Sequence, residues 1–115
     1  MKHGYSLWAV VHKADSRFIG FCGLVPQYID GNPEVEIGYK LAKVYWNQGL
    51  ATEAACAVRS WAFRNLDVPH LISIIDPANL ASQRVAEKIR MRYVQDQEYD
   101  GKICRIYKVK RYPEC

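Results

Sequence analysis

The sequence has no hydrophobic run long enough to cross a membrane and no export signal. A membrane-spanning helix needs about 20 consecutive apolar residues, and no stretch of these 115 residues approaches that length. The first fifteen residues lack the apolar core and cleavage site of a signal peptide, because Lys2, His3 and Lys13 interrupt them. We therefore expect a cytoplasmic protein with no membrane partner, and the length predicts one domain with a single core.

Motifs for metal binding and redox chemistry are also missing. The four cysteines lie far apart without a CxxC pair, and the three histidines show no ligand spacing. We therefore expect no metal ion. We also expect the cysteines to be buried as small hydrophobic side chains, namely Cys22, Cys56, Cys104 and Cys115.

Neither sign of charge dominates, since 16 Lys and Arg stand against 12 Asp and Glu, for a net charge of +4. This small excess suits an anionic cofactor or an acidic partner, although scattered lysines usually form only a solvated surface. The tail KICRIYKVKRY resembles a nucleic-acid-binding surface, but alternating basic residues also protect an edge strand from aggregation. We favour the edge strand, so nucleic acid is not an expected partner.

Apolar periodicity predicts the order of strands and helices. Residues 34–42 alternate between apolar and polar side chains, as in a strand with one buried face. After them the period becomes helical, with one apolar face formed by Leu50, Ala54, Ala57, Val58 and Trp61. Asn79 suits the start of a second helix, and Asp-Gly at 100–101 predicts a hairpin turn. The predicted strands are 6–12, 17–25, 34–42, 70–76, 92–98 and 103–110, and the predicted helices are 50–66 and 79–90.

This order predicts a mixed α/β sheet: three antiparallel strands, a helix, a strand, a helix and a C-terminal β-hairpin. The strand–helix–strand unit over residues 34–76 requires a right-handed parallel crossover. No repeat, low-complexity tract or linker divides the chain.

A glycine, Gly49, stands where the third strand hands over to the first helix. A helix start leaves backbone N–H groups free and carries the positive end of the helix dipole, so it can bind an anion such as phosphate. Gly49 would let the backbone approach a phosphate, Ala51 keeps the next turn small, and Thr52 adds a hydroxyl. A plain turn explains the glycine equally well. The Walker loop and the Rossmann GxGxxG are both absent.

Two segments in the same order, EIGYKLAKVYWNQGLATEA and NLASQRVAEKI, resemble the GNAT superfamily of acetyl-CoA-dependent N-acetyltransferases. The branch is the one that includes the ribosomal-protein N-terminal acetyltransferases, and the resemblance runs from about residue 6 to 110. It implies that the coenzyme A pyrophosphate binds mostly backbone N–H groups of Trp46, Asn47, Gln48, Gly49, Leu50 and Ala51. It also implies that pantetheine lies near Leu41 and the 71–76 strand, that Asn79 contacts coenzyme A, and that Ser82 lies near the thioester sulfur.

The sequence departs from this family at several places. Trp46 stands where arginine or glutamine is common, and Arg90 stands where the second helix usually ends in glycine. The end of that helix therefore differs from the family's, or Arg90 adopts a strained left-handed backbone. Ala86 replaces the tyrosine that many relatives use as general acid.

The family also has a strand and two helices ahead of the segment that matches here. Residues 1–115 are therefore interpreted as a single, N-terminally truncated GNAT-like domain. Because the strand over residues 6–12 is apolar on both faces, we expect a homodimer, or a higher symmetric oligomer, that buries strands 6–12 and 17–25.

Acetyl transfer to an amine needs a base, an oxyanion donor and a proton for the leaving thiolate. Glu36 is the candidate base, and Glu98 is the second candidate. A glutamate that lies on the surface or pairs within a hairpin explains Glu36 equally well. A backbone N–H within residues 38–41 would meet the oxyanion. Ser82 is the first choice for the thiolate, followed by Tyr99 and Tyr107.

The resemblance implies an acetyl-CoA-dependent N-acetyltransferase acting on a primary amine of a small molecule or of a protein N-terminus. The alternative is a catalytically impaired coenzyme A-binding or assembly module with a GNAT core, which the missing elements and Ala86 favour. Glu36, Asn79 and Ser82 favour the enzyme, and the acceptor amine is not identified by the sequence.

Overall fold

The computed structural model describes residues 7–12, 17–41, 49–112 and 114–115, with the backbone alone for 7–12, 17–19 and 41. Its strands are β1 (Leu7–His12), β2 (Arg17–Ile29), β3 (Asn32–Leu41), β4 (His70–Ile75), β5 (Arg92–Tyr99) and β6 (Lys102–Lys110). Its helices are α1 (Leu50–Asn65) and α2 (Leu80–Lys88). The predicted order of elements is therefore confirmed.

The strands form one six-stranded sheet in the order β1-β2-β3-β4-β6-β5. All neighbours pair antiparallel except β3 and β4, which are parallel. Helix α1 connects these two strands along the chain. The mixed α/β sheet is thus confirmed. β2 is longer than expected and runs to the turn at Asp30 and Gly31, both of which have positive φ. Asp100 and Gly101 make the matching turn of the β5–β6 hairpin.

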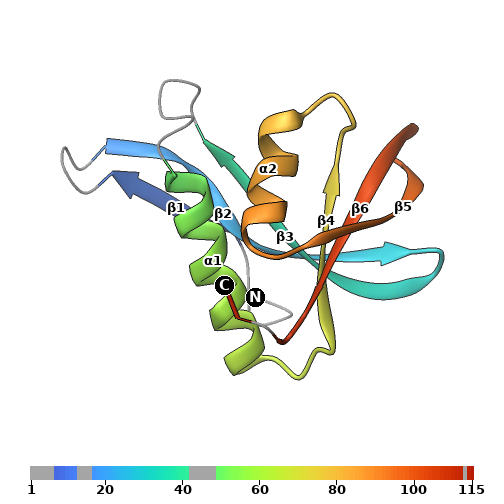
Figure 1. The fold of residues 1–115 in the computed structure, drawn as a ribbon, viewed down its shortest axis with the longest axis horizontal. Coiled ribbons are helices and arrows are strands. Elements are labelled where there is room, and N and C mark those ends of the chain that lie inside the picture. The colour runs from blue at the N-terminus through green and yellow to red at the C-terminus, as the bar shows by residue number, and fades with distance from the viewer. Residues whose placement is uncertain (1–6, 13–16, 42–48, 113) are drawn as a thin grey trace.

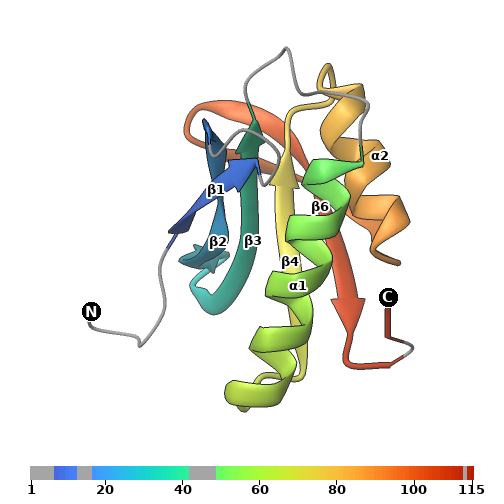
Figure 2. The ribbon, with the colours of Figure 1, turned by 90° about the vertical axis from the view of Figure 1, so that its left-hand side faces the viewer.

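Both helices lie on the same side of the sheet, as the two views agree (Figures 1 and 2). Their buried side chains join alternate residues of β2, β3, β4 and β6 in one apolar core. The core includes Cys22, Leu24, Ile37, Ala55, Val58, Leu71, Ile75, Ala86, Ile89 and Val109.

The buried face of α1 is displaced from the one expected from sequence. Ala57 was expected inside but is exposed, and Leu50, Ala54 and Trp61 are only half-buried. The buried residues are Ala55, Val58, Arg59, Ala62 and Phe63. An arginine takes a core position because its Nη2 donates to the carbonyl oxygen of Lys110 at 3.1 Å and its guanidinium stacks over the Phe63 ring at 5.4 Å.

The start of α2 follows the sequence, whereas the helix ends at Lys88, two residues earlier than expected. Asn79 caps the helix by accepting from the backbone N–H of Ser82 at 3.1 Å. At the other end Arg90 has φ 71°, so of the two alternatives for this position the left-handed backbone is the one observed. The backbone N–H groups of Arg90 and Met91 donate to the carbonyls of Glu87 and Ala86 at 3.0 and 2.9 Å, which closes the helix end.

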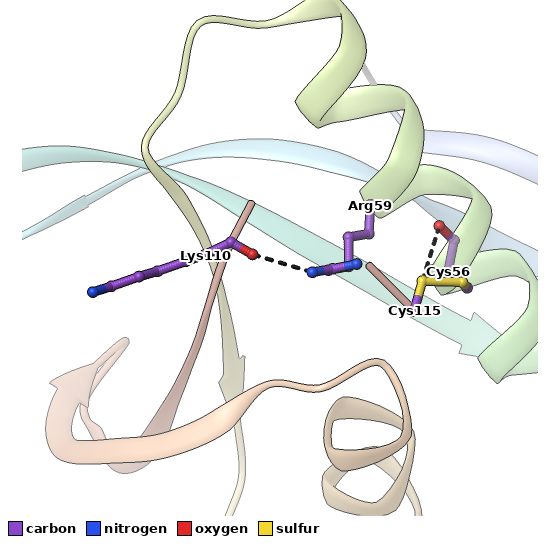
Figure 3. Close-up of a disulfide and its surroundings, with 4 residues drawn as sticks. All are labelled: Cys56, Arg59, Lys110 and Cys115. Carbon is purple, nitrogen blue, oxygen red and sulfur yellow. Dashed lines mark hydrogen bonds between the residues drawn. A yellow bond between two sulfur atoms is a disulfide. The ribbon is translucent and has the colours of Figure 1, made fainter. Parts of the chain in front are cut away.

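The expectation for the cysteines is half wrong. Cys22 and Cys104 are free and buried, and burial raises the pKa of the Cys22 thiol to about 12. Cys56 and Cys115, however, form a disulfide that ties the end of the chain to α1 (Figure 3). No spacing rule could reveal a pair 59 residues apart that folding brings together. Disulfides are rare in reducing compartments, so this pair does not itself support the expected cytoplasmic location.

The tips of two hairpins meet on the side of the sheet opposite the helices. Gln27 of β2 donates to the hydroxyl of Tyr99 at 2.9 Å, and Gln97 donates to Asp30 at 3.2 Å. On this side the apolar side chains of β4 and β6 are also buried, namely Ile72, Cys104 and Ile106.

Two expectations from sequence bear on the outer surface. Within the ranges that the structure describes, no helix is long and apolar enough to cross a membrane. The expected dimer contact is formed by strands 6–12 and 17–25, and the side chains of residues 6–12 and 17–19 lie outside the described ones. The dimer therefore stays a prediction.

Candidate active site

The parallel strands β3 and β4 are paired over only a short stretch. Their register holds a single pair, Glu36 with Ile72, whereas β2 and β3 pair over ten positions. Beyond that pair, side chains take over the hydrogen bonding. The Ser73 hydroxyl donates to the carbonyl of Ile37 at 2.8 Å, and the backbone N–H of Ile74 donates to Glu36 at 3.1 Å. The backbone hydrogen-bond ladder is therefore interrupted toward the carboxyl ends of the two strands, and this interruption is called the gap below.

Glu36, the candidate base, lies at the start of this gap on the side facing away from the helices. Its Oε1 accepts from Gln27 Nε2 at 2.9 Å, and its Oε2 accepts from the backbone N–H of Ile74. Burial raises the pKa of the Glu36 carboxyl, and these two hydrogen bonds only partly oppose the effect. A carboxylate with a raised pKa and a fixed orientation is suited to accept a proton near neutral pH.

Gln27 joins Glu36 to a second candidate. The same Nε2 donates to the Tyr99 hydroxyl at 2.9 Å, so the amide fixes both groups. Because the Tyr99 oxygen accepts this bond, its own hydrogen is available to another acceptor. Sequence reasoning missed Gln27, since only the pairing of β2 with β3 and the approach of the β5–β6 hairpin bring these three residues together.

The start of α1 has the backbone that an anion site needs. Gly49 has φ 76°, and a Cβ placed there would meet no atom within 4 Å. The first backbone bond of the helix runs from the Glu53 N–H to the Gly49 carbonyl at 2.9 Å. The N–H groups of Leu50, Ala51 and Thr52 therefore precede the helical ladder. Trp46, Asn47 and Gln48 lie outside the described residues, as does the side chain of Leu41.

The start of α2 is joined to β3 beyond the Glu36–Ile72 pair. The Tyr39 hydroxyl, from β3, donates to the carbonyl of Ser82 at 2.5 Å, and burial raises the pKa of this tyrosine. The contact links β3 to the first turn of α2. Ser82 is half-buried there, while Asn79 is exposed and uses its Oδ1 as the helix cap.

The other residues considered for proton transfer do not contact Glu36, Gln27 or Tyr99 in the hydrogen bonds described above. Glu98 is exposed on the edge strand β5. Tyr107 is buried in the core on the helix side, with its hydroxyl 3.5 Å from Gln83 Oε1. Ala86 is fully buried in the same core. No group of three or more His, Cys, Asp or Glu that could hold a metal occurs in the part of the chain that the structure describes.

Comparison with known proteins identifies the fold and the family. The family described as "Acetyltransferase (GNAT) domain" matches residues 1–92. YkkB of Bacillus subtilis strain 168 is 40% identical over 110 residues, and the chain spans 64% of its length. The N-acetyltransferase YnaD of the same strain is 37% identical over 62 residues, which are 54% of this chain and 36% of YnaD. The chain thus spans less than two thirds of either relative.

Solved structures agree in fold. An acetyltransferase from Agrobacterium tumefaciens has a TM-score of 0.79 at 28% identity, over 94% of this chain and 62% of that one. The ribosomal-protein-S5-alanine acetyltransferase from Vibrio fischeri has a TM-score of 0.80 at 17% identity, over 99% of this chain and 66% of that one. With a family match over most of its length and this fold, the chain belongs to the GNAT acetyltransferase family.

Proposed function

We propose that the chain is an N-acetyltransferase that moves the acetyl group of acetyl-CoA to a primary amine, with Glu36 as the base. The main support for this proposal is the position of the Glu36 carboxylate. It is held by Gln27 and by the backbone of Ile74 at the gap between β3 and β4, and its pKa is raised by burial. An amine must lose a proton to attack a thioester, and a positioned carboxylate can accept it directly or through one water.

The residues present fit acetyl-CoA. The open, left-handed backbone at Gly49 leaves room for the pyrophosphate against the N–H groups of Leu50, Ala51 and Thr52. The pantetheine arm would enter the gap between β3 and β4, past Asn79 and Ser82. When bound, acetyl-CoA supplies an activated acetyl thioester. The chain's own residues must orient it and handle the protons.

Two hydroxyls compete for the proton that the leaving thiolate needs. Ser82 lies on the first turn of α2, which the Tyr39 contact holds against β3. Tyr99 is held by Gln27 with its own hydrogen free to be donated. A backbone N–H of β3 beyond Glu36 would stabilise the oxyanion. The acceptor is a small molecule or a protein N-terminus.

A second candidate function is a coenzyme A-binding or assembly module without turnover. Ala86 favours it, because this residue is fully buried and offers no acid where many relatives carry tyrosine. This candidate keeps the Gly49 cradle and gives Glu36 a structural role.

Thiol release from acetyl-CoA across a panel of amines, with mass spectrometry of the products, tests the proposal. The panel should contain monoamines, diamines, amino sugars and short peptides with free N-termini. An N-acetylated product is expected from at least one class. If coenzyme A binds by calorimetry but no amine is acetylated, the binding module replaces the enzyme.

A further inference from the structure

A pocket of about 270 Å³ opens at the amino-terminal ends of β3 and β4, away from the start of α1. It lies between the β2–β3 hairpin and the segment that joins α1 to β4. Its apolar wall is formed by Pro26, Pro33, Val35, Val68 and Pro69. The volume is slightly below the range of pockets for drug-sized ligands, so it suits a small molecule or a single side chain.

The polar wall of the pocket connects it to the candidate base. Gln27 lines the pocket, and its Nε2 donates to Glu36 at 2.9 Å. Glu34 also lines it, two residues before Glu36 on the same strand. Alternation along a strand places these two glutamates on one face with their Cα atoms roughly 6.7 Å apart. Gln27 therefore connects the wall of the pocket to the Glu36 carboxylate.

The charge of the pocket comes from Glu34. Its Oε1 accepts from His70 Nε2 at 2.6 Å, which fixes the carboxylate at the pocket wall. The side chains of Glu34 and His70 are only 18% and 25% exposed. A carboxylate accepts at both oxygens, so Oε2 can accept from a ligand ammonium. Tyr28, 72% exposed at the rim, adds an aromatic surface of the kind that attracts cations.

We propose that this pocket selects a diamine acceptor. Glu34 binds the ammonium group that does not react, the proline and valine wall contacts the methylene chain, and the second amine faces Glu36. The inference rests on the proposed acetyl transfer and names its substrate class. A monoamine of the same length fills the apolar wall but leaves Glu34 without its ligand, so it should bind more weakly.

The test compares 1,4-diaminobutane with 1-aminobutane in steady-state thiol release, using the parent chain and Glu34→Gln. The parent should show a KM for the diamine at least tenfold below that for the monoamine. Glu34→Gln should raise the diamine KM about 10- to 100-fold, the range for a lost charged hydrogen bond. Its kcat for the diamine and its KM for the monoamine should stay within about threefold of the parent's.

Two further variants separate binding from structural support. Glu87→Gln removes an exposed carboxylate on α2 and should behave as the parent. His70→Gln keeps an N–H donor for Glu34, so the preference for the diamine should persist. An equal rise of both KM values in Glu34→Gln, or an unchanged diamine KM, overturns the proposal.

Calorimetry of 1,4-diaminobutane in the presence of coenzyme A keeps the two hypotheses apart. If the parent acetylates no amine but binds the diamine, and Glu34→Gln does not, then acetyl transfer is wrong and the pocket assignment stands. If the parent acetylates monoamines without preference, the enzyme stands and the diamine site falls. A parent that neither binds nor acetylates the diamine at millimolar concentration also overturns the site.

Discussion

On the helix side of the sheet, Ile37 and Leu71 pack in an apolar core with α1 and α2. On the opposite side, the neighbouring residues Glu36 and Ile72 lie where the tips of two hairpins meet. The described helices bring mostly apolar side chains to their face, with Arg59 and Gln83 as the buried polar exceptions. The hairpins bring Gln27 and Tyr99, whose polar groups can hold a carboxylate.

Because of this difference in side chains, we assign stability to the helix side of the sheet and the proton transfer at Glu36 to the opposite side. A buried carboxylate is costly unless it is hydrogen-bonded. Two partners orient Glu36, yet its pKa is still raised, so the ionised form carries a net cost. A group kept at such a cost is a candidate for function rather than for stability. The predictions below test that division of roles.

Removing the charge at Glu36 should have the largest effect. Glu36→Gln should lower kcat for the acetylated amine by roughly 10²- to 10⁴-fold, the usual contribution of a general base. Its affinity for coenzyme A should be nearly unchanged. Stopped-assay thiol release and calorimetry measure the two quantities. Equal turnover in the variant would transfer the role of base to Glu98 or to water.

Truncating Leu71 on the helix side should lower stability instead. Leu71 is fully buried, so Leu71→Ala should cost about 2–5 kcal/mol in the free energy of unfolding. Urea denaturation followed by fluorescence measures it. Ile103→Ala is the matched control, because Ile103 is 58% exposed on β6 and its truncation should cost less than about 0.5 kcal/mol. Similar losses in both variants would contradict the assigned core.

Opening the disulfide should destabilise the helix side without affecting the reaction centre. Cys115→Ser releases a crosslink between residues 59 apart, for which the chain-entropy model gives about 4 kcal/mol. The melting temperature of the parent should fall in reductant, and that of the variant should not respond. A parent insensitive to reductant would mean that Cys56 and Cys115 are not joined in solution.

Substitutions at Gly49 test whether the start of α1 binds coenzyme A. A side chain there is strained by the positive φ, although space for a Cβ is open. Gly49→Glu adds the same strain as Gly49→Ala and also a charge facing the proposed pyrophosphate. Calorimetry should show coenzyme A binding at least tenfold weaker for Gly49→Glu than for Gly49→Ala, which is about 1.4 kcal/mol. Equal affinities would exclude this cradle.

The smallest effect is a difference in the pH dependence of stability. Because the folded-state pKa of Glu36 is raised, its contribution is fully present below the unfolded-state value of about 4.3 and is lost as the pH rises through the folded-state value. Glutamine does not ionise, so Glu36→Gln does not lose stability at this position as the pH rises. Relative to the parent, the variant should therefore be more stable at pH 7 than at pH 4. Glu87→Gln is the control, and a reversed sign would contradict the burial of Glu36.

Much of the fold could be predicted because its signals are local. The Asp-Gly turn at 100–101, the Asn79 cap and the change of period after Gly49 each lie within a few residues. Predictions failed where distant segments meet. Arg59 is buried because it donates a hydrogen bond to Lys110 and stacks over the Phe63 ring. Strand β2 continues past Val25 because Pro26 lies opposite Val35 in the sheet. Cys56 forms its disulfide with Cys115, 59 residues away.

The candidate site divides in the same way. The sequence by itself determined that Glu36 lies on the polar face of its strand and that Gly49 begins a helix, because alternation and glycine's backbone freedom act within one element. Only the tertiary structure decided that Glu36 is buried, that Gln27 couples it to Tyr99 and that Glu34 lines a pocket. Desolvation and hydrogen bonding between side chains as far apart in sequence as Gln27 and Tyr99 depend on how the hairpins pack, which no local pattern specifies.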